Sequence, residues 1–157
     1  MLCYDSDRPG LIPPEAAAIL IYGDGDTKWT PAEIARFPHA RRRTISVLNN
    51  PKIAAVLDVE LGDAAPADAP GFLAYRREHY GDDGAIYCNR ATLPKVQAEL
   101  ALLHGDYRIW LATLDGTKPT GITGGGRLVA VQFERDPEDR YDVSVIYDTA
   151  WLRQPPA

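Results

Sequence analysis

Two carboxylates, Asp58 and Glu60, lie two residues apart at the end of the apolar run 54–60. In a β-strand, side chains at this spacing point to the same face, with the two residues about 6.6 Å apart along the strand. Two negative charges so close repel each other, so one carboxyl group should hold its proton more tightly than the other. Glycoside hydrolysis requires such a pair, because a neutral acid protonates the leaving oxygen while an anion stabilises the developing positive charge.

The same spacing also has a structural interpretation. Asp58 could point inward and cap a neighbouring helix, while Glu60 could simply leave the strand into solvent. The apolar residues that precede the pair keep the catalytic interpretation open, because the C-terminal ends of the strands form the active face of a parallel barrel.

Further acids lie at the ends of other predicted strands. Asp5 ends the first strand, Asp24 follows the second, Asp115 follows the sixth, and Asp142 lies at the start of the last. If these ends converge on one rim, the acids build a cleft suited to a neutral sugar with an oxocarbenium-like transition state. Each acid alone is also a residue type common in turns.

Aromatic residues accompany the acids. Tyrosine and tryptophan combine an apolar face with a polar group, and such rings commonly form the floor of sugar-binding clefts. Core packing is the alternative for each of them. The candidates are Tyr4, Tyr22, Trp29, Tyr87, Trp110 and Tyr141.

Eight strand-like segments would position these side chains. They cover residues 2–5, 16–22, 43–47, 54–60, 84–88, 107–114, 128–133 and 141–147, with helices expected at 30–38, 71–80 and 93–103. Continuous apolar strands alternating with helices indicate a parallel sheet covered by helices. The sequence therefore predicts an α/β fold, a single small TIM-barrel-like (β/α) barrel over residues 1–152, with a short C-terminal tail at 153–157.

The chain is short for such a barrel. A complete (β/α) barrel takes roughly 200–250 residues, whereas this chain has 157. We therefore expect loops in place of helices after the first, third, sixth and seventh strands.

Composition narrows the classes of partner. The net charge of -5 argues against a nucleic-acid partner, which requires a positive face. No apolar run reaches the roughly 18–20 residues of a membrane span. The N-terminus lacks the basic start and apolar core of a signal peptide, so we expect the chain to be made and used inside a cell, or to leave it by phage lysis or within a virion.

A metal site is not expected. The two cysteines, Cys3 and Cys88, fall in strands predicted to lie far apart and are interpreted as reduced packing residues. The three histidines are scattered, without the spacing of metal ligands.

Two motifs are the most specific in the chain: Asp58-Val59-Glu60 and Tyr87-Cys88-Asn89-Arg90. They occur in order with Tyr4-Asp5-Ser6, Tyr22-Gly23-Asp24-Gly25, Trp29-Thr30, Thr44-Ile45-Ser46-Val47, Trp110-Leu111-Ala112, Val131-Gln132-Phe133 and Tyr141-Asp142-Val143-Ser144. Over nearly its whole length the chain thus resembles a family of glycoside-hydrolase-like domains of actinobacteria and their phages. That family is distantly related to the family 25 muramidases, the barrel lysozymes that cleave peptidoglycan.

The resemblance implies specific roles. Glu60 would be the general acid, and Asp58 would orient the 2-acetamido group of the substrate, which then supplies its own nucleophile in a retaining mechanism. No metal or organic cofactor is implied. The expected catalytic residues are Glu60, Asp58 and Asp5; the expected substrate-binding residues are Asp142, Tyr22, Asp24, Tyr87, Trp110 and Gln132.

One departure concerns the sixth strand. Relatives often carry Ala-Asp after its tryptophan, whereas this chain has Ala112-Thr113, with Asp115 two residues later.

Two functions follow from the resemblance. The first is hydrolysis of bacterial cell-wall glycan. The second is a non-catalytic glycan-binding or structural module, in contact with other proteins of a phage virion, a phage tail or a cell envelope. The environment of Glu60 separates them, because a general acid needs the raised pKa that burial provides.

Overall fold

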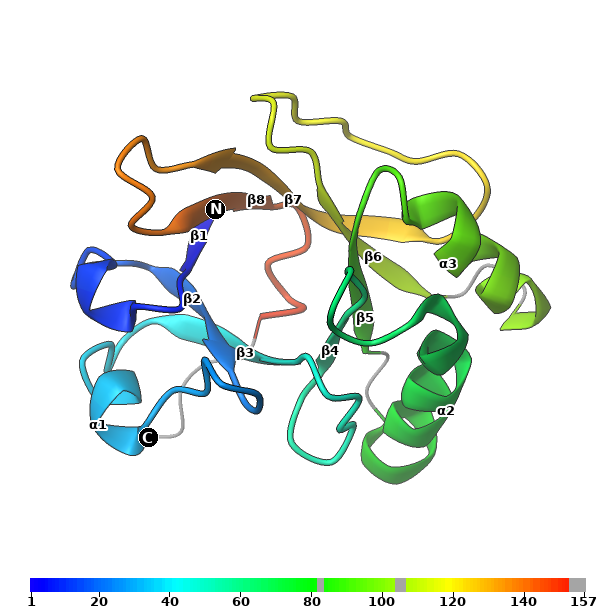
Figure 1. Cartoon of the computed structure of the whole chain (residues 1–157), viewed down its shortest axis with the longest axis horizontal. Coiled ribbons are helices and arrows are strands. Elements are labelled where there is room, and N and C mark those ends of the chain that lie inside the picture. Colours follow the sequence, from blue (N-terminus) through cyan, green and yellow to red (C-terminus); the bar gives the residue numbers. More distant parts are fainter. Residues whose placement is uncertain (82–83, 104–106, 153–157) are drawn as a thin grey trace.

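The computed structural model describes residues 1–81, 84–103 and 107–152. In this part of the chain eight strands form a closed barrel in sequence order (Figure 1). All eight predicted strands are confirmed. They are β1 (Leu2–Asp5), β2 (Ala18–Tyr22), β3 (Arg41–Ser46), β4 (Val56–Asp58), β5 (Ala85–Asn89), β6 (Arg108–Ala112), β7 (Arg127–Arg135) and β8 (Asp142–Ile146).

The barrel is not wholly parallel, which corrects the sequence prediction. Strands β1 to β6 each pair in parallel with the next, whereas β8 runs antiparallel to both β7 and β1. A parallel return needs a crossover of a dozen or more residues, and the connection 136–141 is too short for one. It is a tight turn instead, in which the Asp136 amide donates to the Tyr141 carbonyl (2.9 Å) and Arg140 pairs with the Asp136 carboxylate (2.8 and 2.9 Å).

The reversal of β8 decides where Asp142 lies. In an all-parallel barrel the first residue of β8 would lie at the opposite end from the other strand-terminal acids. In the antiparallel arrangement Asp142 lies directly opposite Asp5 on β1 and Arg135 on β7. The short turn thus brings a predicted site residue to the rim where the parallel strands end.

Within the described ranges, three α-helices lie outside the barrel: α1 (Pro31–Ile34), α2 (Ala69–Tyr80) and α3 (Leu93–Leu100). Short 3₁₀ helices cover Pro9–Leu11, Pro66–Asp68 and Ala101–Leu103. As predicted, none of the described segments that follow β1, β3, β6 and β7 forms an α-helix. Helix α1 ends at Ile34, earlier than expected, and the chain continues in tighter turns in which the Arg36 amide donates to the Glu33 carbonyl (3.2 Å). Its predicted start is confirmed by reciprocal bonds between Thr30 and Glu33.

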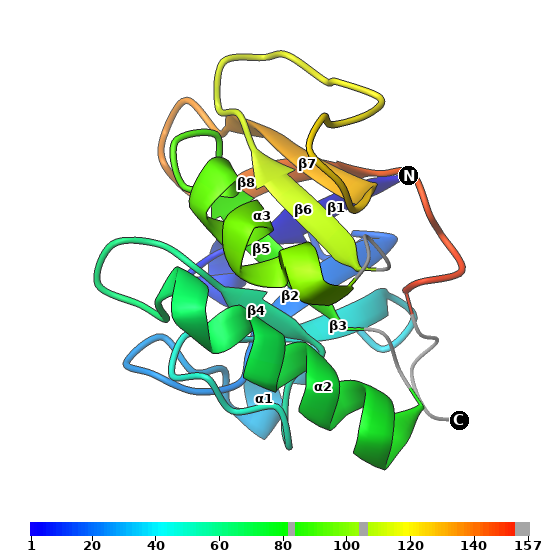
Figure 2. The same cartoon turned by 90° about the vertical axis from the view of Figure 1, so that its right-hand side faces the viewer.

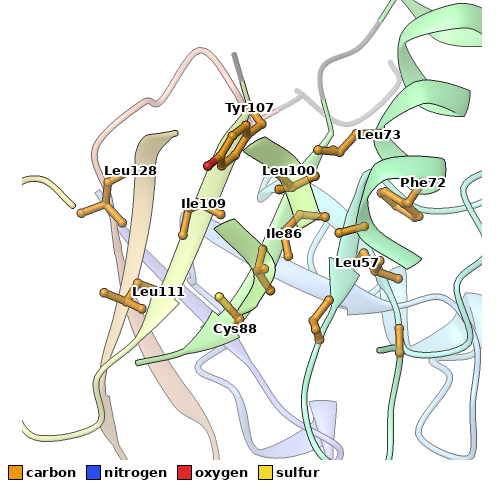
Figure 3. Close-up of a cluster of buried hydrophobic side chains, with 14 of the residues drawn as sticks. Leu57, Phe72, Leu73, Ile86, Cys88, Leu100, Tyr107, Ile109, Leu111 and Leu128 are labelled. Atoms are coloured by element: carbon orange, nitrogen blue, oxygen red, sulfur yellow. The ribbon is translucent and has the colours of Figure 1, made fainter. Parts of the chain in front are cut away.

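Helices α2 and α3 cover one side of the barrel, over β4, β5 and β6 (Figure 2). Figure 3 shows the apolar layer between them, in which Phe72 and Leu73 of α2 and Leu100 of α3 face Leu57, Ile86 and Ile109 on the strands. This layer is the outer core and holds β4 and β5 in place beneath the site.

Inward-pointing side chains fill the barrel itself. Trp110 lies at its centre and meets Trp151 edge to face, with ring centroids 5.9 Å apart. Trp151 and Leu152 follow β8 and close the end of the barrel at which the parallel strands begin. There the Arg43 side chain donates to the Trp151 carbonyl (2.6 Å). The interior is therefore a packed core rather than a channel, so a ligand cannot pass through the barrel.

Cys3 lies inside the barrel and Cys88 in the outer core, and both are free, as predicted. The predicted tail at 153–157 lies outside the described residues. Across the residues that are described, none of the helices combines the length and the apolar character that crossing a membrane requires.

Candidate active site

A cleft of about 460 Å³ opens at the rim where the parallel strands end. Ligand sites typically enclose roughly 300–1,000 Å³, so this volume suits a small ligand or one unit of a polymer. Most of the residues that line it are acidic or aromatic: Asp7, Tyr22, Asp26, Asp58, Glu60, Asp63, Tyr87 and Asp142. Arg135 also lines it.

Asp58 is the last residue of β4, and only 5% of it is exposed. Its Oδ1 atom has no hydrogen-bond partner in the described part of the chain. Burial, and then the negative charges of Glu60 and Asp63, raise its pKa from 3.8 to about 9. Asp58 therefore enters the cleft as a neutral carboxylic acid at neutral pH.

Glu60 lies two residues beyond the end of β4. The chain there still follows β5, because the Val59 amide donates to the Tyr87 carbonyl (2.9 Å), and then turns so that the Asp63 amide donates to the Glu60 carbonyl (3.2 Å). Asp58 and Glu60 both line the cleft, but Glu60 lies beyond the strand in which the sequence placed it, because β4 ends at Asp58.

The Glu60 side chain is half-buried, unlike that of a freely solvated residue. Desolvation raises its pKa and is the largest influence, opposed by the Asn89 amide, which donates to Oε1 at 3.5 Å. The charges of Asp63 and Asp142 raise the pKa further. This is the environment that a general acid needs.

Asp5 ends β1 on the neighbouring part of the rim and is also 5% exposed. The Tyr22 hydroxyl donates to its Oδ2 at 3.5 Å, while Oδ1 lacks a partner among the described residues. Burial and the charge of Asp142 raise its pKa well above the ordinary value, against smaller lowering effects of Tyr22 and Arg135. The three predicted catalytic acids thus meet at one rim.

Asp142 accepts two hydrogen bonds from Arg135, at 2.9 Å to Oδ1 and 3.4 Å to Oδ2. Arg135 is the only cation among the described residues that line the cleft. Arg135 received no role from the sequence, because the strand was expected to end at residue 133, whereas β7 continues to Arg135.

A smaller side pocket of about 230 Å³ adjoins the cleft. Asp7, Tyr22, Arg135 and Asp142 line both, whereas Asp5 lines the side pocket and Glu60 the cleft. The two spaces therefore present different acids to a ligand.

Tyr22 and Tyr87 are the predicted aromatic residues that line the cleft. The Tyr87 ring rests edge to face on Trp110, with centroids 5.8 Å apart. Trp110 itself is fully buried and donates to the Ser144 hydroxyl (3.1 Å), and Gln132 is only 2% exposed. Neither Trp110 nor Gln132 lines the cleft; Trp110 supports Tyr87 from below.

Asp24 has a structural role in the segment that leaves β3. Its carboxylate accepts from the Ser46 hydroxyl (2.5 Å) and from the backbone amide of Val47 (2.8 Å). It thereby fixes the segment that leaves β3, where Val47 and Leu48 line the cleft, but Asp24 itself does not line it.

Two further residues near Glu60, Asn89 and Asp63, received no role from the sequence, although Asn89 belongs to the motif Tyr87-Cys88-Asn89-Arg90. Asp115 lies elsewhere and pairs with Arg90 (2.5 Å). Hydrogen bonds from Thr117 and the charge of Arg90 lower its pKa to about 2, so Asp115 does not join the acids of the cleft.

The arrangement offers two kinds of carboxyl group: a half-buried one that can exchange a proton with a ligand, and two deeply buried ones that favour the neutral form. No group of three or more histidine, cysteine, aspartate or glutamate side chains within the described ranges is placed to hold a metal ion. The sequence matches no protein-family model and no curated protein, and no solved structure matches the fold.

Proposed function

We propose that this protein is a glycosidase that acts on bacterial cell-wall glycan, with Glu60 as its general acid. The observation that carries the proposal is the position of Glu60, a half-buried carboxyl group with a raised pKa that lines a cleft at the strand ends. A raised pKa means that Glu60 holds its proton more tightly than an exposed glutamate, and its position allows that proton to reach a ligand.

Asp58 has the complementary environment. It is too deeply buried to be the primary proton donor to a glycosidic oxygen, but it lies on the same side of the cleft as Glu60. Its neutral carboxyl group can bind the 2-acetamido group of an amino sugar. As positive charge develops on the sugar, the anionic form of Asp58 becomes more favourable, so Asp58 would stabilise the transition state more strongly than the ground state.

The proposed reaction follows the substrate-assisted course implied by the motif resemblance. Glu60 gives its proton to the glycosidic oxygen as the bond from that oxygen to the anomeric carbon breaks, and the acetamido oxygen forms a bond to the same carbon. The Glu60 carboxylate then removes a proton from a water molecule that opens the cyclic intermediate. Configuration is retained because the anomeric carbon is attacked twice.

The fold is compatible with this proposal. Eight strands in sequence order around a closed barrel, with a cleft at the C-terminal ends of the parallel strands, are features of TIM-barrel enzymes. We infer that the chain is a reduced member of that architecture, related to the barrel lysozymes, with helices lost and the last strand reversed. Tyr22 and Tyr87 would contact the sugar rings.

The test is release of reducing sugar from purified actinobacterial peptidoglycan by the wild type, the Glu60→Gln variant and a matched Glu99→Gln control. Glu99 is exposed on α3, outside the residues that line the cleft. We expect the wild type and Glu99→Gln to release sugar equally. The Glu60→Gln variant should lose at least a hundredfold in rate, since general acid catalysis contributes roughly 10²–10⁴-fold.

An equally active Glu60→Gln variant would refute the assignment of the general acid. If the folded wild type released nothing while a control lysozyme cut the same substrate, the protein would be a glycan-binding or structural module instead. Sedimentation of the protein with peptidoglycan would then detect binding without cleavage.

A further inference from the structure

The side pocket holds a buried carboxylate whose hydrogen bonds are incomplete. Asp5 is 5% exposed and lines this pocket, where Oδ1 has no partner among the described residues and Oδ2 accepts only the long bond from Tyr22. A buried polar atom without a partner is costly, and native structures usually satisfy such groups. A hydrogen-bond donor that enters the pocket would satisfy Asp5 Oδ1, and it would do so best with Asp5 in its ionised form.

The charges around the pocket favour a positively charged donor. Four acids line it: Asp5, Asp7, Asp139 and Asp142. The two cations of the lining are directed to carboxylates other than Asp5: Arg135 to Asp142 (2.9 Å) and Asp139 (3.4 Å), and Arg140 to Asp136 (2.8 Å) and Glu138 (3.6 Å).

A primary ammonium group fits these demands. It carries three donors and a full positive charge in a compact shape, so one donor can reach Asp5 Oδ1 while others face the Tyr22 oxygen or water. A neutral sugar hydroxyl would supply one donor and leave the acidic field uncompensated.

We propose that the side pocket binds a primary ammonium group of the ligand, held by Asp5 and Tyr22, and that its carrier is an amino sugar without an N-acetyl group. The choice of a sugar rests on the proposed function, whereas the ammonium group rests on the geometry around Asp5. Because Asp5 lines the side pocket and Glu60 the adjoining cleft, this sugar would neighbour the unit whose bond is cleaved. The protein would then prefer partly deacetylated glycans.

The environment of Asp5 also predicts a second measurable effect of ammonium binding. Burial and the charge of Asp142 raise the pKa of Asp5 well above its ordinary value, so Asp5 holds a proton more tightly in the free protein than an exposed aspartate does. A bound ammonium group would stabilise the Asp5 carboxylate and displace that proton, so binding should release protons to the buffer.

The experiment is calorimetric titration at pH 7 and low ionic strength with three probes: a glucosamine tetrasaccharide, an N-acetylglucosamine tetrasaccharide and Nα-acetyl-lysine methylamide. The proteins are the wild type, Asp5→Asn and the control Asp115→Asn, whose acid pairs with Arg90 outside both pockets. Repeating each titration in two buffers of different ionisation enthalpy counts the released protons.

We expect the wild type to bind the glucosamine oligomer at least tenfold more tightly than the acetylated one, with proton release and with weakening by salt. Asp5→Asn should remove the preference and the proton release, and Asp115→Asn should keep both. Binding of the lysine derivative alone, dependent on Asp5, would retain the ammonium site and assign it to a peptide amine.

Equal or tighter binding of the acetylated oligomer by the wild type, with no response to the lysine derivative, would overturn the proposal. That comparison needs no variant, so it stands even if Asp5→Asn does not fold. Cleavage of peptidoglycan without any preference for an amine would reject this inference and leave the proposed function intact. A preference for the amine without cleavage would retain the ammonium site and reject the proposed function.

Discussion

Replacing Asp58 by asparagine is expected to make the protein more stable at neutral pH. The substitution keeps the size of the side chain and removes the ability to ionise. In the folded chain burial raises the pKa of Asp58 from 3.8 to about 9. Since the folded state holds this proton while the unfolded state releases it, the ionisable group favours unfolding throughout the interval between those two values.

The magnitude follows from the pKa shift. Each pH unit above 3.8 costs the folded state about 1.4 kcal/mol until the folded pKa is reached, so at pH 7 the cost is about 4 kcal/mol. This is an upper bound for the gain in Asp58→Asn, because the amide also needs partners in the cleft. For a domain of this size each kilocalorie corresponds to about 2–4 °C in Tm. Below pH 3.8 both states of the wild type are protonated and the gain should vanish.

Urea unfolding followed by tryptophan fluorescence between pH 4 and pH 9 measures this difference directly. The matched comparison is Asp136→Asn, the same substitution at an acid whose pKa Arg140 lowers to about 2. Its stabilising contribution is present at neutral pH and is lost as the pH falls toward 2, so this variant should be less stable than the wild type at pH 7. An Asp58→Asn variant that is no more stable than the wild type at pH 7, or whose advantage does not shrink toward pH 4, would refute the reasoning.

Three further changes test individual contacts. Arg135→Gln removes a charge that lowers the pKa of Glu60. Glu60 should then stay protonated to higher pH, so the alkaline limb of the kcat/KM profile should move to higher pH. An unchanged limb would show that Arg135 does not influence the pKa of the general acid. Trp110→Phe should lower the free energy of unfolding by about 1–3 kcal/mol, because it opens space in the core and leaves the Ser144 hydroxyl unpaired; a change in KM without a loss of stability would instead place Trp110 in contact with substrate. Asp24→Ala should cost about 1–3 kcal/mol and raise KM, because the Ser46 hydroxyl and the Val47 amide lose their acceptor; chemical denaturation and steady-state kinetics check both effects.

The strands were predictable because their residues are apolar and β-branched in short runs separated by glycine, proline and aspartate. The absence of four crossover helices was also predictable, from chain length alone. The direction of β8 was not, because the apolar pattern of a strand is the same whichever way it runs. The information was in the short connection 136–141, where Asp136 and Arg140 lie at the spacing of a closed turn.

Strand ends predicted which acidic residues lie at the rim, but they did not predict which of the other candidate residues are exposed there. Asp5, Asp58 and Asp142 meet at the rim because each lies at a strand terminus. Trp110 and Gln132 also lie on strands that reach the rim, but both are buried in the barrel. A sequence gives the face to which a side chain points, whereas its depth along the barrel axis depends on the stagger between strands, which is a tertiary property.

The pKa values needed the structure as well. From the sequence alone, one member of the Asp58 and Glu60 pair was expected to hold its proton more tightly, without deciding which. The answer depends on burial, which is deeper for Asp58 because it belongs to β4, while Glu60 lies on the turn beyond it.

The pairing of β1 with β8 joins the two ends of the described chain, and this has a consequence for synthesis on the ribosome. Strand β1 emerges early but cannot complete its pairing until β8 has been made, so the ring closes through a contact of very long sequence separation, a kind that slows folding. Until then β1 presents an open edge that can pair with another nascent chain. Asp5 and Asp142 face each other across this same seam. A chain interrupted before β8 would therefore have most of the barrel but would lack Asp142, and its acidic rim would be incomplete.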